Sequence, residues 1–159
     1  MSQNIKFEFS AKKATSKDVS SISNLLRLYS KMGNLLPRTD ADIEKNIADF
    51  RVIESEEKEI IACGALERFS NELIEIRSLV VNPNYQGTGL GKVLVNHLIN
   101  TARDDGAKRV MALTYSVGFF EKLGFEVVDK SIFPEKIWSI CINCYKFKNC
   151  DEVAVVLYL

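Results

Sequence analysis

A glycine-rich turn, Gln86–Lys92, lies between two stretches with clear secondary-structure patterns. Before it, Leu73–Val81 is dense in β-branched and aliphatic residues and stops at Asn82-Pro83-Asn84, which predicts a strand that feeds a turn. After it, apolar residues recur at helical spacing from Leu90 to Leu98, so a helix begins at the glycines. The first amides of a helix lack carbonyl partners and lie at the positive end of the helix dipole. This stretch therefore predicts a site for a phosphate group.

The spacing of the glycines separates three kinds of phosphate loop. A P-loop needs a glycine five residues before its Gly-Lys pair and Ser or Thr after that pair, but those places hold Gln86 and Val93. A dinucleotide-binding loop needs the spacing G-x-G-x-x-G, which Gly87, Gly89 and Gly91 do not match. The spacing that remains is Gln86-x-x-Gly89-x-Gly91.

This frame, entered from a Val-Val-Asn-Pro strand end, resembles the coenzyme A pyrophosphate loop of the GNAT acyltransferase superfamily, and the downstream motif Phe120-Glu-Lys-Leu-Gly-Phe125 agrees with it. The resemblance implies that acetyl-CoA is the cosubstrate and that backbone amides of the turn bind its diphosphate. It also implies that main-chain groups of the preceding strand meet the pantetheine arm and the thioester carbonyl. The cofactor-binding residues that it implies are Leu79, Val80, Val81, Gln86, Gly87, Thr88, Gly89, Leu90, Gly91, Lys92 and Phe120.

Hydrophobic periodicity and turn residues predict the elements that position this turn. The predicted strands are Ile5–Phe9 continued by Ala11–Ala14, Phe50–Glu54, Glu59–Phe69, Leu73–Val81, Arg109–Tyr115, Phe125–Val128 and Val153–Leu159. The predicted helices run from Thr15 or Ser16 to near Gly33, from a capping box of Thr39 and Asp42, from the glycine-rich turn to Asp104–Gly106, and over Gly118–Leu123. The fold class is α/β, with a mixed sheet of six to seven strands and about four flanking helices, in agreement with the GNAT fold.

Composition limits the protein to one domain, 1–159, with a small-molecule ligand. The chain has 159 residues, is 47% hydrophobic, and carries 21 basic and 21 acidic residues, so no net field attracts nucleic acid or an acidic membrane. The N-terminus lacks an apolar signal-like segment, which predicts a cytoplasmic location. A homodimer is compatible with the sequence, which does not determine the oligomeric state.

Acyl transfer from a thioester to an amine also needs a base for the ammonium proton. Glu75 and Arg77 lie two apart within an apolar strand and share a face with Leu79 and Val81. One interpretation is a neutralised pair at the sheet surface. The other is that Glu75 accepts the amine proton while Arg77 orients a carboxylate, and the resemblance favours it because GNAT enzymes often place a carboxylate on this strand.

The sequence leaves two alternatives for protonation of the leaving thiolate. Many GNAT enzymes carry a Tyr in the short helix as general acid, but here that place holds Phe120. Either Tyr115 substitutes from the preceding strand end, or the thiolate leaves without enzymic protonation; Tyr115 is equally a candidate packing aromatic. His97 falls beside the apolar positions of the central helix, which indicates a packed imidazole rather than a base.

The C-terminal region carries three closely spaced cysteines. Cys141-x2-Cys144-x5-Cys150 has one zinc-like step but only three thiolates, whereas a closed structural zinc site normally has four ligands. Cys63 lies far away in the sequence. In a cytoplasmic protein we expect all four to be reduced thiols, and we predict no metal.

A narrower resemblance extends over about residues 19–159. Its motifs are Leu36-Pro-Arg-Thr39, Phe50 before Val-Ile-Glu54, Cys63-Gly-Ala-Leu66, Glu75-Ile-Arg-Ser-Leu79, Ala112-Leu-Thr-Tyr115 and the cysteine-bearing tail. Together they resemble the short, stand-alone N-acetylglutamate synthase-like acetyltransferases. The resemblance implies acetyl transfer from acetyl-CoA to L-glutamate, the first step toward arginine. Longer synthases carry an amino-acid-kinase domain, and its absence from this sequence places feedback control by arginine in doubt.

An amino-acid acceptor needs cations for its carboxylates. Arg38 is the first candidate because it aligns with the substrate arginine of the family. Arg77, Lys136 and Lys146 follow, although ordinary surface charge explains either lysine alone. The rivals are an N-acetyltransferase for glutamine or another amino acid, a protein N-terminal acetyltransferase, and a catalytically silent CoA-binding regulator, which Phe120 favours.

Overall fold

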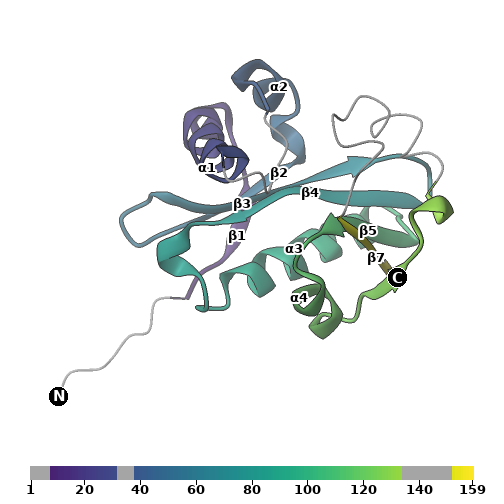
Figure 1. The fold of residues 1–159 in the computed structure, drawn as a ribbon. Helices are drawn as coiled ribbons and strands as arrows, with labels where there is room; N and C mark the ends of the chain where they lie inside the picture. Colours follow the sequence, from purple (N-terminus) through teal and green to yellow (C-terminus); the bar gives the residue numbers. More distant parts are fainter. Residues whose placement is uncertain (1–7, 32–37, 134–151) are drawn as a thin grey trace. The chain divides into compact units, whose positions relative to one another are not determined.

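The computed structural model describes residues 8–31, 38–133 and 152–159 (Figure 1). Seven strands form one mixed sheet in the order β1-β2-β3-β4-β5-β7-β6. The strands are β1 (Ala11–Lys13), β2 (Phe50–Glu54), β3 (Ile60–Arg68), β4 (Leu73–Val81), β5 (Arg109–Thr114), β6 (Glu126–Val128) and β7 (Val153–Tyr158). The helices are α1 (Val19–Lys31), α2 (Asp40–Lys45), α3 (Leu90–Asp104) and α4 (Val117–Lys122), with short 3-10 turns at Ser16–Asp18, Ile47–Asp49, Pro83–Tyr85 and Lys130–Ile132.

The chain divides into two compact units, and the division passes through β3 and β4. The first unit comprises 1–65 and 78–98, and the second comprises 66–77 and 99–159. Within the described residues, none of the helices combines the length and hydrophobicity needed to cross a membrane.

In the first unit, helices cover both faces of the strands (Figure 1). β2 pairs antiparallel with β1 and β3, with Val52 opposite Cys63. One face packs against α1 and α2 through a core that includes Ile22, Leu26, Ile43 and Phe50. The other face meets α3, because a Cβ placed on Gly64 would lie 2.9 Å from Leu98 Cδ1. A glycine is needed at this point for close approach of strand and helix.

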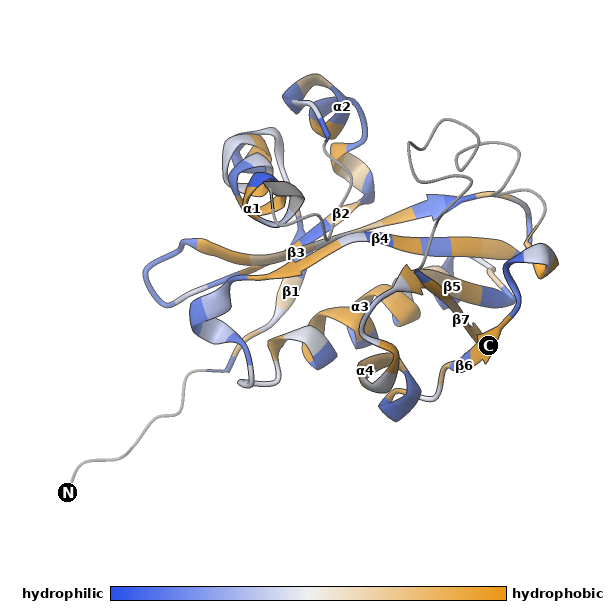
Figure 2. Cartoon of the chain, in the orientation of Figure 1, coloured by the Kyte–Doolittle hydropathy of each residue, from blue (hydrophilic) through white to orange (hydrophobic). Residues whose placement is uncertain are grey.

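In the second unit, the first half of β4 pairs in parallel with β5, and β7 lies antiparallel between β5 and β6. Leu73, Met111, Ala154 and Val156 form its buried core together with Phe133. Hydrophobic residues run along β4 and are interrupted by a short hydrophilic stretch (Figure 2).

Local sequence signals explain where the helices begin. The hydroxyl of Thr39 accepts a hydrogen bond from Asp42 N at 3.1 Å and caps α2, as its spacing predicts. Before α1, the carboxylate of Asp18 accepts from Thr15 N at 2.8 Å. Val19, Ile22 and Leu26 recur at helical spacing along α1 and are buried.

The structure confirms the predicted fold class and corrects several bounds. The predicted first strand is wrong in extent: only Ala11–Lys13 forms β1, residues 8 and 9 lie outside it, and residues 5–7 lie outside the described residues. The short helix begins at Val117 rather than Gly118. Gly91 lies inside α3, so it is not one of the residues that bend the turn.

Candidate active site

The glycine-rich turn has the backbone shape that the sequence predicts. Gly87 and Gly89 adopt φ values of +80° and +87°, in the left-handed region, with no atom within 4 Å of a Cβ built on either. Glycine is therefore needed at both positions for its backbone conformation rather than for space. A hydrogen bond from Val93 N to Gly89 O at 3.1 Å opens α3. The N–H groups of the first helical turn precede this bond and face a ligand or water.

The protein's own contacts hold the approach to this turn. Asn82 accepts a hydrogen bond from Asn84 N at 2.9 Å through its side chain, and a second from Tyr85 N at 2.9 Å through its carbonyl. The Thr88 hydroxyl donates to the Tyr85 carbonyl. Residues 86–89 are exposed, so the preformed backbone remains open to solvent.

Ser78 interrupts β4 with a φ of +54°, which is a left-handed conformation for a residue with a Cβ. Its hydroxyl accepts a hydrogen bond from Arg38 Nη1 at 3.1 Å, and its carbonyl lies 3.5 Å from the Cys63 thiol, which donates to it. A left-handed residue breaks the alternation of a strand. The predicted uninterrupted face from Glu75 to Val81 is therefore wrong at Ser78.

Arg38 is held in one orientation by three contacts. Its Nε donates to Asp42 Oδ2 at 2.6 Å, its Nη1 meets Ser78, and its guanidinium lies 5.0 Å from the centre of the Phe50 ring. Asn46 donates to the other Asp42 carboxylate oxygen at 2.9 Å. The Arg38 side chain is only 14% exposed. Among the described residues these contacts engage Nε and Nη1, so Nη2 is left to meet a ligand.

Glu75 and Arg77 form the ion pair that their spacing predicts, and a third charge joins them. Arg77 Nε lies 3.1 Å from Glu75 Oε1, and Arg77 Nη1 contacts a carboxylate oxygen of Glu67. The Glu75 side chain is 2% exposed, whereas that of Glu67 is 43% exposed. Glu75 is therefore a buried carboxylate that lies beside a guanidinium.

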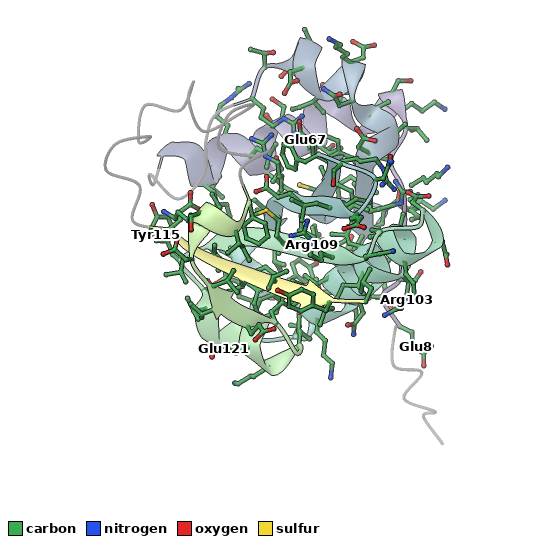
Figure 3. All side chains as sticks on the ribbon, turned by 90° about the vertical axis from the view of Figure 1, so that its right-hand side faces the viewer. Glu8, Glu67, Arg103, Arg109, Tyr115 and Glu121 are labelled. Carbon is green, nitrogen blue, oxygen red and sulfur yellow. The ribbon has the colours of Figure 1, made fainter. Side chains whose placement is uncertain are left out.

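The two aromatic candidates occupy different environments. Phe120 is 3% exposed, and its ring packs edge to face with Phe119 and Phe125 at centroid distances of 5.1 Å. Tyr115 follows the last residue of β5, is 44% exposed, and lies apart from Glu67 (Figure 3). A phenol in this position has a proton to donate, and a buried hydrocarbon ring has none.

Burial shifts the pKa values of two further titratable candidates, His97 and Cys63. Burial lowers the pKa of the His97 imidazole, and the Arg51 guanidinium lowers that pKa further. Burial raises the pKa of the Cys63 thiol to about 12. Within the described residues, no group of three or more His, Cys, Asp or Glu could hold a metal ion. Cys141, Cys144, Cys150, Lys136 and Lys146 lie outside the described residues.

The sequence predicts the glycine-rich turn, Arg38 and Glu75 as candidate site residues, and the structure adds two groups that contact Arg38. Nothing in the sequence indicates that Ser78 leaves the extended conformation, since it lies within a regular strand pattern. Asp42 carries a signal, but only as a helix-capping residue. Its second role depends on an ion pair with Arg38 at i,i+4 spacing.

In this mixed sheet, β4 leads into a glycine-rich turn at the start of α3. Such a helix start is typical of proteins that bind an anionic cosubstrate at that position. The sequence model of the acetyltransferase (GNAT) family matches residues 21–125. The chain therefore belongs to the GNAT acetyltransferase family and is an N-acetyltransferase that uses acetyl-CoA as cosubstrate.

Three of the similar proteins illustrate the relationship. The uncharacterized N-acetyltransferase CT2212 of Chlorobaculum tepidum is 36% identical over 139 residues, covering 87% of this chain and 89% of that protein. The amino-acid acetyltransferase of Yersinia pseudotuberculosis is 33% identical over 125 residues, 77% of this chain. The structure of N-acetylglutamate synthase from Neisseria gonorrhoeae, complexed with coenzyme A and N-acetyl-glutamate, matches 97% of this chain with a TM-score of 0.86 and 29% identity. The matches cover only 28% of the Yersinia protein and 36% of the Neisseria chain.

Proposed function

We propose that this protein transfers the acetyl group of acetyl-CoA to the α-amine of L-glutamate, forming N-acetyl-L-glutamate and coenzyme A. The observation that carries the acceptor assignment is the fixed guanidinium of Arg38 beside Ser78 of β4, in a chain that matches a synthase crystallised with N-acetyl-glutamate. This reaction would place the protein at the first step toward arginine, in the cytoplasm. The oligomeric state that we propose to test first is a homodimer.

The coenzyme binds through main-chain groups in this proposal. The backbone amides from Gln86 to Lys92 take the diphosphate, since Gly87 and Gly89 already hold the left-handed conformations that aim them outward. Main-chain groups of Leu79–Val81 meet the pantetheine arm and the thioester carbonyl. Phe120, which the resemblance also implies for the coenzyme site, has a buried ring that packs against Phe119 and Phe125.

Glu75 acts as the base. The α-ammonium of glutamate passes one proton to the Glu75 carboxylate, directly or through one water, and the resulting amine attacks the thioester carbonyl carbon. The C–N bond forms, the nitrogen of the tetrahedral intermediate loses a second proton to solvent, and the C–S bond breaks to release the coenzyme A thiolate. Tyr115 or solvent then protonates the thiolate, a Tyr115 phenolate regains its proton from solvent, and the proton on Glu75 returns to solvent.

The acceptor carboxylates bind cationic side chains. Arg38 is the first choice because two directed hydrogen bonds fix its guanidinium before the substrate arrives. Arg77 is a weaker choice because it already contacts both Glu75 and Glu67. Lys136 and Lys146 complete the set proposed from the sequence.

An acceptor screen tests this function. Release of the coenzyme A thiol from acetyl-CoA is measured with L-glutamate, L-glutamine, other amino acids and a peptide with a free N-terminal amine. We expect the highest kcat/KM with glutamate. A higher value for glutamine or for the peptide refutes the glutamate assignment. Coenzyme A binding without thiol release from any acceptor supports instead the silent CoA-binding regulator.

A further inference from the structure

The hydroxyl group of Tyr29 connects three segments that are distant in the sequence. Tyr29 lies near the end of α1, and its hydroxyl donates a hydrogen bond to the Val81 carbonyl at 2.7 Å. Gln86 Nε2 donates to the same hydroxyl oxygen at 2.6 Å. A phenol has one proton to donate and lone pairs to accept, so a single group makes both bonds. All three residues belong to the first compact unit.

The two partners of Tyr29 bracket the approach to the glycine-rich turn. Val81 is the last residue of β4, and Gln86 is the first residue of the turn. Residues 86–89 are exposed, so packing does little to hold this part of the chain. The hydroxyl therefore ties the exposed turn to the end of α1 and to the end of the strand.

The contact also assigns a direction to the Gln86 side chain. Its amide nitrogen points to Tyr29 within the protein, rather than outward to a ligand. The backbone amides of the turn are then the groups that meet the diphosphate. The Gln86 side chain instead anchors the turn to Tyr29. This explains why a neutral amide serves at a position beside a phosphate site.

We propose that Tyr29 is a positioning residue that holds the glycine-rich turn in the conformation that binds coenzyme A. The inference rests on the proposed binding of the coenzyme diphosphate by Gln86–Lys92. Without the hydroxyl, the turn samples other conformations, and the affinity for the coenzyme falls in proportion to the fraction of molecules that remain competent. The side chains proposed to bind the acceptor carboxylates take no part in this contact.

The test compares Tyr29→Phe, Gln86→Leu and the double variant with the wild-type protein. Tyr85→Phe is the matched control, because Tyr85 lies one residue before the turn and its ring packs edge-on against Phe9 at 6.2 Å. The measurements are the Kd of coenzyme A by titration calorimetry, the KM values of acetyl-CoA and of the acceptor, kcat, and Tm.

We expect Tyr29→Phe to raise the Kd of coenzyme A and the KM of acetyl-CoA about tenfold, the range expected for lost hydrogen bonds. The acceptor KM and the kcat at saturating acetyl-CoA should stay within about twofold of wild type. Gln86→Leu should give a similar increase in Kd, and the double variant should bind no more weakly than the weaker single variant, since both remove one connection.

Three results would overturn the inference. A Tyr29→Phe protein with a lower Tm but a wild-type Kd would show that the hydroxyl contributes to stability and not to coenzyme binding. Effects that multiply in the double variant would show that the two residues act separately, and a Tyr85→Phe effect as large as that of Tyr29→Phe would show a nonspecific cause. Should Tyr29→Phe fail to fold, the exposed Gln86→Leu variant decides by the same Kd. Failure of the wild-type protein to bind coenzyme A would instead refute the proposed function.

Discussion

Replacing Glu75 with glutamine should separate a catalytic base from a structural ion pair. Glutamine keeps the shape of the side chain and leaves an oxygen that can accept from Arg77 Nε, which lies 3.1 Å from the carboxylate in the wild-type protein. It removes the negative charge of the carboxylate that is proposed to accept the proton. Loss of a general base typically reduces turnover about 10²- to 10⁴-fold. We therefore expect Glu75→Gln to raise the barrier by about 3–5 kcal/mol.

The same variant should change stability much less. Removing one partner from a fully buried ion pair costs about 3–5 kcal/mol when it leaves an uncompensated charge. Here Arg77 is 23% exposed and keeps its contact with Glu67. We expect the free energy of unfolding to fall by about 1–2 kcal/mol, with the reduced charge attraction as the main cost. Denaturant unfolding measures this value, and titration calorimetry should show an unchanged Kd for coenzyme A.

Glu67→Gln is the matched control, because it removes the other carboxylate from the same arginine. The Glu67 side chain is 43% exposed, so its ion pair contributes about 1 kcal/mol or less. Turnover, measured as thiol release at saturating acetyl-CoA and glutamate, should stay within about threefold of wild type. Equal losses in the two variants would assign the effect to Arg77 geometry, and a Glu75→Gln enzyme within about threefold of wild type would refute the base assignment.

Three further variants or measurements test the surrounding site. Gly89→Ala places a Cβ on a residue with φ +87°, at a cost of about 1–2 kcal/mol, and should raise the acetyl-CoA KM at least about fivefold, whereas Gly118→Ala in α4 should not. Asp42→Asn removes the charged partner of Arg38 Nε and should raise the glutamate KM about tenfold with the acetyl-CoA KM unchanged. Because burial raises the pKa of the Cys63 thiol to about 12, this cysteine should stay unlabelled by iodoacetamide at pH 8 in the native protein and react after unfolding, as peptide mass spectrometry reports.

Each of these expectations has a result that contradicts it. A Gly89→Ala protein with a wild-type acetyl-CoA KM would show that the turn does not bind the diphosphate through this conformation. Asp40→Asn is the control for Asp42→Asn, since Asp40 lies in the same helix but accepts from Ser23 at 2.5 Å. An equal effect of the two variants on the glutamate KM would exclude a specific role for Asp42. Rapid native labelling of Cys63 would contradict its burial.

Local signals in the sequence were sufficient for most of the fold. The bounds of β2 and β4 agree with the predicted strands residue for residue, because β-branched runs end at clear turn residues. The cap at Thr39 and the glycine-rich start of α3 were predictable for the same reason, since each depends on residues within one helical turn. The predicted first strand failed because alternation alone cannot show whether a neighbouring strand is present to pair with it.

The contacts that shape the candidate site are not local. Arg38 reaches Ser78 across 40 positions of the sequence, and Gln86 reaches Tyr29 across 57. The left-handed conformation of Ser78 is stable only with support from such contacts, because it costs a residue with a Cβ about 1–3 kcal/mol. No short-range sequence pattern indicates this energetic cost or the long-range contacts that offset it. The strand was therefore predicted as regular.

The two arginines near the central strand have different partners. Arg77 contacts two carboxylates, so its guanidinium already has two anionic partners. Arg38 contacts one carboxylate, a neutral hydroxyl and an aromatic ring. A guanidinium that already faces two carboxylates attracts a further carboxylate less strongly than one that faces a single carboxylate. We therefore infer that Arg38, rather than Arg77, binds a carboxylate of the acceptor.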